Sequence, residues 1–241
     1  MLPSSLLPRL LSAAALTLLT ADPIVAQERQ ARAPGASFER VESSGGIDVY
    51  LTQGPTAAVA VEAQPEVLPR VVTEVKANTL VIRWEKGFQP WKMANRPFRA
   101  RVYVTAPRLS GVTLSGGADA HGQTPITTDN FQIEASGGGD VNLTLHVKML
   151  RADASGGSDL TLTGRAETQE ISTSGGSDYH GFGLQSTTAR IGASGGSDAE
   201  VWVEGDLTAN ASGGSDLRYR GAARLSQMSS SGSSSVRRVK E

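Results

Sequence analysis

The sequence has no cysteine among its 241 residues. That absence excludes a disulfide framework, a thiolate metal site, a cysteine nucleophile and the lipid anchor of a bacterial lipoprotein. The fold must therefore be stabilised by packing and backbone pairing. A long domain can supply both more readily than a small secreted scaffold can.

Net charge and long apolar runs are also lacking. The 23 Lys and Arg residues nearly balance the 24 Asp and Glu residues, so the composition gives no electrostatic signature of nucleic-acid binding. One apolar run, over residues 10–20, follows Arg9 and precedes a short segment that ends at Ala26. It is too short for a transmembrane helix, which needs about 20 residues, and it is typical of a secretory signal peptide.

These features predict the organisation of the chain. Residues 1–26 are expected to be a signal peptide, and residues 27–37 a linker to a single domain over residues 38–241. We expect the protein to be exported to the periplasm, the cell surface or the extracellular space, with neither a transmembrane segment nor a lipoprotein anchor.

The pentapeptide Ser-Gly-Gly-x-Asp recurs along the chain at a nearly constant spacing. Copies begin at Ser115, Ser136, Ser155, Ser174, Ser194 and Ser212, a degenerate copy begins at Ser231, and an early copy begins at Ser44. Repeats of about 20 residues are typical of stacked architectures. Regular coils are therefore predicted over residues 111–235, and a β-rich insertion over residues 52–105 is predicted to separate them from the early copy.

Each pentapeptide lies between two stretches of alternating apolar and polar residues, as in Val141, Leu143 and Leu145. Glycines such as Gly164 and Gly205 mark a second corner between these stretches. The pattern predicts an all-β fold, a right-handed parallel β-helix or solenoid of two-strand coils of about 19 residues with a hairpin-rich N-terminal part. The Gly and Ser content excludes a helical repeat, because it would cost too much helix propensity.

Stacked coils would place the aspartates of the pentapeptides in one column. These residues are Asp119, Asp140, Asp159, Asp178, Asp198 and Asp216. Neighbouring carboxylates about 4.8 Å apart repel by about 0.9 kcal/mol even in bulk water, so a compensating interaction is expected. Backbone N–H groups of adjacent corners could supply it, and so could bound Ca²⁺, which favours several oxygen ligands. No other cofactor is predicted.

Aromatic residues are concentrated in the insertion, where they alternate with basic residues. This group consists of Trp84, Phe88, Trp91, Phe98 and Tyr103. Such a patch could stack on sugars or dock a protein partner. The interpretation that we favour is that the rings cap the open end of the solenoid, because an exposed terminal coil invites edge-to-edge pairing.

The pattern gives little support for catalysis. The histidines, His121, His146 and His180, fall at positions that are too far apart on the coils to share one site. The nearest candidates for a paired-carboxylate site are Asp198, Glu200 and Asp216. Outward positions of a solenoid are polar by default, however, so a non-catalytic protein is predicted.

Several further segments match a known family. They are residues 38–41, 46–51, 52–54, 78–82, 102–104 and 107–109, together with the Gly-rich corners. In these segments the chain resembles the auto-transporter adhesin head GIN domain family, and the resemblance covers nearly all of the chain after residue 26. It implies a pectin-lyase-like right-handed β-helix with no catalytic residues and a role in cell-surface adhesion.

The sequence therefore predicts an exported, non-catalytic binding or adhesion protein of the bacterial envelope. Its expected partner is a surface glycan or an envelope protein. Two alternatives stay open, a carbohydrate-active enzyme of the pectin-lyase-like type and an envelope structural protein that self-associates as a homo-oligomer through its coil ends.

Overall fold

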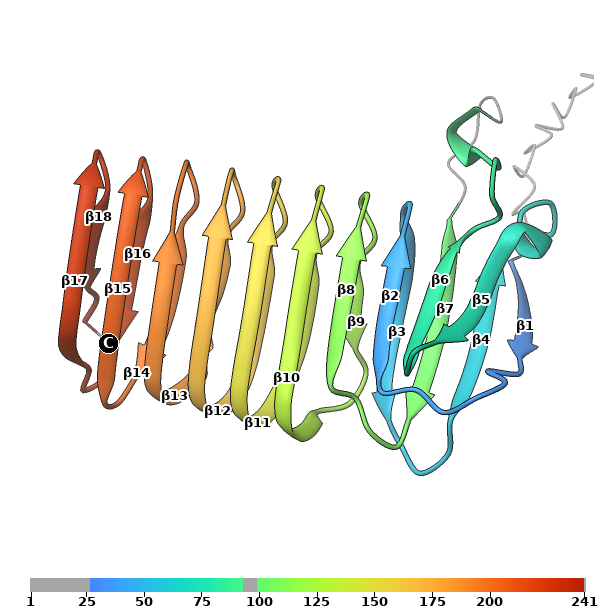
Figure 1. Ribbon diagram of the computed structural model, residues 1–241, viewed down its shortest axis with the longest axis horizontal. Helices are drawn as coiled ribbons and strands as arrows, with labels where there is room; N and C mark the ends of the chain where they lie inside the picture. Colours follow the sequence, from blue (N-terminus) through green and yellow to red (C-terminus); the bar gives the residue numbers. More distant parts are fainter. Residues whose placement is uncertain (1–26, 93–98, 241) are drawn as a thin grey trace, which may run out of the picture.

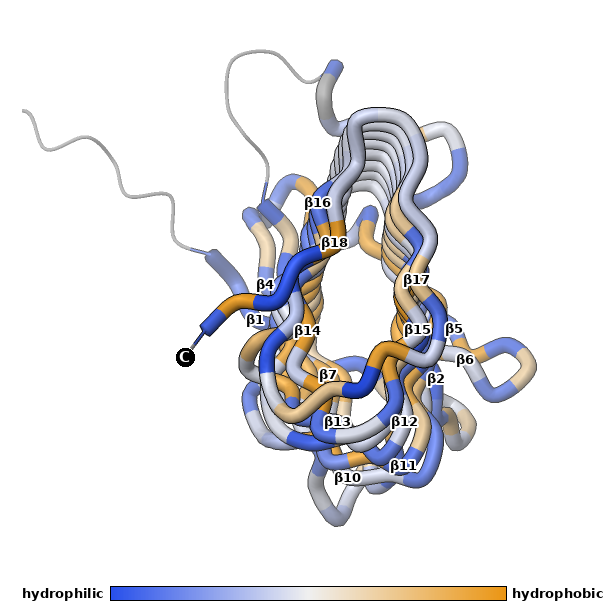
Figure 2. The backbone as a smooth tube through the Cα atoms, turned by 90° about the vertical axis from the view of Figure 1, so that its left-hand side faces the viewer, coloured by the Kyte–Doolittle hydropathy of each residue, from blue (hydrophilic) through white to orange (hydrophobic). Residues whose placement is uncertain are grey.

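The computed structural model describes residues 27–92 and 99–240, which form strands, turns and two short 3-10 helices (Figure 1). The strands stack into a solenoid with two walls joined by corners, and Figure 2 looks along its axis. The first wall contains β2 (Arg40–Ser44), β6 (Thr79–Trp84), β8 (Gly111–Ser115), β10 (Ile126–Ser136), β15 (Asp206–Gly213) and β17 (Arg224–Gly232). The second wall contains β3 (Ile47–Gln53), β7 (Ala100–Ala106), β9 (Ala120–Gly122), β14 (Ala199–Val203), β16 (Asp216–Arg220) and β18 (Ser235–Arg238). The predicted parallel β-solenoid is confirmed.

Three strands belong to both walls, which differs from the prediction of two separate strands in every coil. These strands are β11 (Val141–Ser155), β12 (Leu160–Ser174) and β13 (Tyr179–Ala193). β11 and β12 stay paired through the second corner, where Leu145 lies opposite Gly164 and His146 opposite Arg165. Because these coils have the same length, the register is kept through the bend and the corner becomes a curved strand instead of a break.

The N-terminal coils are not stacked in chain order. β2 pairs in parallel with β8 on one side and with β6 on the other, and β3 lies in the same way between β9 and β7. The predicted β-rich insertion therefore supplies an additional coil outside the early pentapeptide coil. Its other strands, β4 (Ala58–Ala63) and β5 (Val71–Lys76), pair antiparallel with β7 and β6, which gives the predicted hairpin-rich part.

Part of the predicted linker is a strand. β1 (Glu28–Arg32) pairs antiparallel with β4, with Gln30 opposite Val61. The prediction of a linker over residues 27–37 is therefore wrong for residues 28–32. The physical reason is that β4 would otherwise present an unpaired backbone edge at the N-terminal end of the second wall, and β1 covers it.

The core fills the space between the walls with inward-pointing aliphatic side chains. Most strands between β2 and β16 alternate buried and more exposed residues, as in Val141, Leu143 and Leu145 of β11, which are at most 1% exposed. Some of the buried residues are polar, and three of them form a hydrogen-bonded chain inside the core. The Tyr179 hydroxyl donates a 2.6 Å hydrogen bond to Gln169 Oε1, and Gln169 Nε2 donates a 2.7 Å bond to Ser186 Oγ. These buried groups satisfy one another, so the polar chain is compatible with the apolar core.

Candidate functional site

The aspartates of the pentapeptides form one column along the Ser-Gly-Gly corners, as predicted. Asp48 of the early copy is aligned with Asp119, and every later aspartate follows one coil further on. In each pair the backbone N–H of one aspartate donates to the carboxylate Oδ1 of the aspartate in the preceding coil. The distances run from 2.8 Å, for Asp198 N to Asp178 Oδ1, to 3.4 Å, for Asp119 N to Asp48 Oδ1.

This ladder provides the backbone compensation that was expected for the column. A carboxylate that accepts a backbone N–H is stabilised in its charged form, which offsets the repulsion from the next carboxylate. At the N-terminal end of the column, the backbone hydrogen bond does not fully offset the repulsion between carboxylates. There, burial and the neighbouring charge of Asp119 raise the pKa of Asp48, despite the hydrogen bond from Asp119 N.

Metal ligation by the column is not evident from its geometry. Within residues 27–92 and 99–240, no group of three or more His, Cys, Asp or Glu side chains is arranged to hold a metal ion. Calcium binding by Asp119, Asp140, Asp159, Asp178, Asp198 and Asp216 stays a prediction that a titration can test.

The structure divides the aromatic group of the insertion between the two walls. Trp84 ends β6 in the first wall, and its ring contacts Phe88 at a centroid distance of 5.4 Å. Tyr103 lies on β7 in the second wall, where its ring stacks on Tyr50 at 5.0 Å and the Arg29 guanidinium covers it at 3.9 Å. Phe98 and the side chain of Trp91 lie outside the described part. The three described rings therefore do not lie together, and ligand binding by this group stays a prediction.

Trp84 covers the N-terminal end of the column of corner glycines, while capping of the solenoid end by the aromatic group as a whole stays a prediction. Its ring is 9% exposed, and its indole N–H donates a 2.8 Å hydrogen bond to the carbonyl of Gly45. Gly45 begins the column of corner glycines, and a Cβ at this position would lie 2.9 Å from the Trp84 ring. The indole thus takes the place of one more corner and closes this column at its N-terminal end.

The predicted carboxylate candidates do meet, but around a cation. Arg218 lies within 4 Å of all three, with its guanidinium 3.9 Å from Asp198, 3.5 Å from Glu200 and 3.8 Å from Asp216. His180 lies 3.8 Å from Glu200. This arrangement is an ion-pair network on the outer face of the second wall. The guanidinium occupies the position between the carboxylates that a paired-carboxylate mechanism would need for its substrate.

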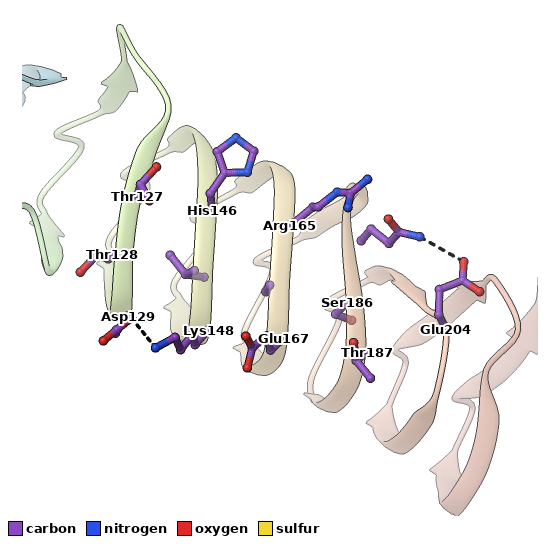
Figure 3. Close-up of a pocket in the computed structure, with 13 residues that line it drawn as sticks. Thr127, Thr128, Asp129, His146, Lys148, Arg165, Glu167, Ser186, Thr187 and Glu204 are labelled. Carbon is purple, nitrogen blue, oxygen red and sulfur yellow. Dashed lines mark hydrogen bonds and ion pairs between the residues drawn. The ribbon is translucent and has the colours of Figure 1, made fainter.

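The outer surface has a groove at the second corner, which we call the corner groove (Figure 3). It has a volume of about 620 Å³ and crosses the coils of β10, β11, β12 and β13 as far as Glu204. Two rows of outward side chains border a floor of small residues, and the register of the coils aligns all three. The first row is Thr127, His146, Arg165 and Gln185; the second row is Asp129, Lys148, Glu167 and Thr187; the floor is Thr128, Val147, Ala166 and Ser186.

The second row of the corner groove contains one ion pair and one further carboxylate, Glu167. Lys148 Nζ lies 2.9 Å from Asp129 Oδ1, and this bond, together with the charges of Asp129 and Glu167, raises the pKa of Lys148. Figure 3 shows the ion pair at one end of the row. The first row is different, because the side chains of His146 and Arg165 make no hydrogen bond or ion pair within the described part of the chain. Among the described residues, unpaired charge therefore lies on both sides of the groove, at Arg165 in the first row and at Glu167 in the second.

The far end of the corner groove is fixed by Glu204. Its Oε1 accepts a 2.6 Å hydrogen bond from the Trp202 indole, its Oε2 accepts the backbone N–H of Ala222 at 3.1 Å, and Gln185 Nε2 lies 3.5 Å away. These donors lower the pKa of Glu204, with the Ala222 N–H as the largest cause. Beside it, the Arg220 guanidinium lies 4.4 Å from the centroid of Trp202. This end is consequently a preformed, rigid boundary.

Sequence reasoning did not identify the corner groove. Its first-row residues share no residue type, so the repeat gave no signal. The signal that could have found them is their common offset from the pentapeptide, because His146 and Arg165 each follow their aspartate by six residues. His121 stacks on Tyr50 and His180 lies beside Glu200, so the three histidines stay apart, as predicted.

Comparison with known proteins identifies the family. The model described as "Putative auto-transporter adhesin, head GIN domain" matches residues 37–223. The chain belongs to this family, which confirms the resemblance drawn from the sequence. No curated protein matches the chain significantly.

Solved structures confirm the fold at low sequence identity. A "putative adhesin" from Bacteroides fragilis superposes with a TM-score of 0.81 at 19% identity, over 90% of this chain and 99% of that one. A "Putative lipid binding protein" from Parabacteroides distasonis gives 0.68 at 18% identity, over 89% and 97% of the two chains. A "putative adhesin" from Parabacteroides merdae gives 0.68 at 19% identity, over 89% and 96%. At these identities the likeness establishes the architecture alone.

Within residues 27–92 and 99–240, no helix has the length and apolar character needed to cross a bilayer.

Proposed function

We propose that the protein is an exported, non-catalytic binding protein of the adhesion type, and that the corner groove is its ligand-contacting surface. The observation that carries this proposal is the groove itself, in which the coil register aligns two polar rows over a floor of small side chains. Export is supported by the signal-like segment over residues 1–26, which lies outside the described residues. Cell fractionation combined with surface proteolysis tests this part of the proposal.

The groove is suited to binding without chemistry. Its floor is nearly closed, since Val147, Ala166 and Ser186 are 7%, 6% and 2% exposed. Two of the three carboxylates that border it are held by partners, Asp129 by Lys148 and Glu204 by Trp202 and Ala222. Polar rows in register over a nearly closed floor favour recognition of an extended polar ligand by hydrogen bonding.

The test uses an array that carries glycans, envelope proteins and lipid vesicles, because one structural neighbour is titled a lipid binding protein. Thr187→Trp places a large ring in the groove, and Ser172→Trp places the same ring at an exposed position on the first wall. We expect the wild-type protein and Ser172→Trp to bind the same partner, while Thr187→Trp loses it. Identical binding by all three proteins would refute the groove as the contact surface. Depolymerisation of a bound polysaccharide would instead favour the carbohydrate-active enzyme.

Self-association is a second candidate function, and it is favoured by the last described coil. The inward-facing Leu225 and Met228 of β17 are 38% and 55% exposed. Residues 225–232 carry neither a charge nor a proline, the devices by which edge strands avoid pairing. Sedimentation velocity should then show a dimer that Met228→Lys disrupts and that Ser229→Lys, with the same added charge on the opposite face, leaves intact. A monomeric wild-type protein would rule this candidate out.

A further inference from the structure

We infer that the C-terminal coil is a dimer interface, in which β17 of one copy pairs antiparallel with β17 of a second copy about a two-fold axis at Met228. The inference rests on the second candidate function, self-association, and adds to it the pairing strand, the symmetry and the register. It starts from four strands that, within the described residues, are paired on one side only: β1, β5, β17 and β18.

Three of these four edge strands carry charges, which discourage pairing with another strand. The charged residues are Glu28, Arg29 and Arg32 in β1, Glu74 and Lys76 in β5, and Arg237 and Arg238 in β18. β17 is the exception, because its residues after Arg224 include neither a charge nor a proline. Of the four edges, β17 is therefore the one that is open to a further strand.

No described residue of the chain covers the edge of β17. After β18 the chain continues along the second wall, where the backbone N–H of Val239 donates a 2.8 Å hydrogen bond to the carbonyl of Tyr219. Figure 2 faces this end of the solenoid and shows the last residues leading away from β17. The N–H and C=O groups of β17 that point away from β15 therefore have no backbone partner in the described part of the chain. Such a row of groups is complementary to another β-strand.

The side chains along this edge add an apolar requirement. Leu225 and Met228 are in register with Leu207 and Ala209 of β15, which are fully buried, yet they are themselves 38% and 55% exposed. Val236 of β18 packs against the same core. One more strand over the edge would cover Leu225 and Met228, so the partner strand should itself present apolar side chains on its inward face.

A second copy meets both requirements with its own β17. The uncharged edge then faces an uncharged edge, and the inward Leu225 and Met228 of the two copies cover one another. A head-to-tail contact would instead place the C-terminal coil against β1 and β5, the charged edges of the N-terminal end. A closed two-fold dimer is therefore favoured over a filament.

Met228 fixes the position of the axis, because it is the most exposed of the large hydrophobic side chains in the described residues. Opposite residues of an antiparallel pair lie on the same face of the sheet, so a residue at the axis lies opposite its own copy. An axis at Met228 brings the two Met228 side chains together on the inward face. It also places Gln227 opposite Ser229 of the second copy on the outward face, since both alternate with Met228.

This symmetry has a consequence for ligand binding. A two-fold axis that reverses the strand direction places the second corner of one copy at the same edge as the Ser-Gly-Gly corner of the other. The two corner grooves then face opposite sides of a rod of twice the length. A dimer of this shape can contact two ligands at once, which raises its apparent affinity for a surface that carries many copies of a ligand.

Disulfide cross-linking tests the register, and the absence of native cysteine makes the reaction specific. Gln227→Cys and Ser229→Cys carry tags of different size and are oxidised separately and as a mixture. In the proposed pair the Cα atoms of residues 227 and 229 of opposite copies are about 5 Å apart, while equal residues are about 8 Å apart, beyond the reach of a disulfide. We expect the mixture to cross-link roughly tenfold or more faster than either variant alone.

Two controls accompany this reaction. Ser172→Cys carries its thiol at an exposed position on the first wall, away from the interface, and should not cross-link with Gln227→Cys. Met228→Lys, added to both cysteine variants, should reduce the cross-linking of the mixture to the level of Ser172→Cys, because it places two like charges at the axis.

The outcomes separate the inference from the candidate function on which it rests. Cross-linking of either variant with itself as fast as in the mixture would overturn the register. An equal rate with Ser172→Cys would overturn the interface, because it would indicate random collision. If sedimentation velocity shows a wild-type dimer and the mixture does not cross-link, the dimer forms elsewhere, so the inference is wrong and self-association stands. A monomeric wild-type protein would refute both.

Discussion

Asp159, in the middle of the aspartate column, offers a direct test of how the column is held together. Its Oδ1 accepts the backbone N–H of Asp178 at 3.2 Å, and its own N–H donates to Asp140 Oδ1 at 3.0 Å. Asp159→Asn keeps an acceptor oxygen and removes the charge. Asp159→Ala removes both, so the difference between the variants isolates the hydrogen bond from the repulsion.

The magnitudes follow from the geometry. Each neighbouring carboxylate, about 4.8 Å away, repels Asp159 by about 0.9 kcal/mol in bulk water, and physiological salt reduces this to roughly half. Relief from both neighbours is therefore worth about 1 kcal/mol. A hydrogen bond to a charged acceptor is worth about 1.5–3 kcal/mol, and the lower end applies here because the side chain is partly exposed. Asp159→Asn should be nearly neutral, and Asp159→Ala should be less stable than Asp159→Asn by about 1–1.5 kcal/mol.

Urea denaturation in the presence of EDTA, followed by circular dichroism, measures these differences. Equal stability of the two variants would refute the conclusion that backbone N–H donors compensate the column. The same proteins examine the Ca²⁺ expectation. A rise of the wild-type melting temperature on addition of Ca²⁺ that Asp159→Asn reduces would establish cation binding by the column, and no rise would exclude it.

Three further substitutions probe other parts of the fold. Trp84→Phe removes the indole donor to the Gly45 carbonyl and should cost about 1 kcal/mol in urea denaturation, with no loss expected if the ring alone caps the column. Tyr179→Phe leaves the buried Gln169 Oε1 without its 2.6 Å donor and should cost about 1–3 kcal/mol, unless the side chain of Gln169 finds another partner. Because the pKa of Asp48 is raised, its contribution to stability is present below its ordinary pKa and is lost as the pH rises through the raised value. The melting temperature of Asp48→Asn minus that of the wild type should therefore be more positive at pH 7 than at pH 4. The same difference at both pH values would contradict the raised pKa.

The regular coils were predictable because their period is nearly constant. When Ser136, Ser155 and Ser174 recur at equal intervals, only one register stacks like side chains, and the aspartate column follows from it. The hydrogen bonds from Asp N–H groups to carboxylates were one of two compensations that the sequence left open. The structure shows the backbone N–H donors within hydrogen-bonding distance of the carboxylates. Ca²⁺ binding by the column stays a prediction.

Other features depend on information that a repeat does not contain. The position of β6 and β7 outside β2 and β3 could not be derived, because the coil of residues 79–106 lacks the pentapeptide and chain order suggests an interruption instead. The corner groove was missed for a different reason. Its character arises from three unlike neighbours, His146, Arg165 and Gln185, which come together only through the register of curved strands.

The placement of the insertion at the N-terminal end has a consequence for how proteins of this architecture can change in length. Within the described residues, the antiparallel strands β1, β4 and β5 pair with strands formed by residues before 107, and the Trp84 indole donates to Gly45 in the same part of the chain. Duplication of a unit such as residues 155–173 would extend the rod by about 4.8 Å and leave that end intact. The reach of the molecule from its N-terminal end can thus evolve in small equal steps, independently of the parts that close the stack.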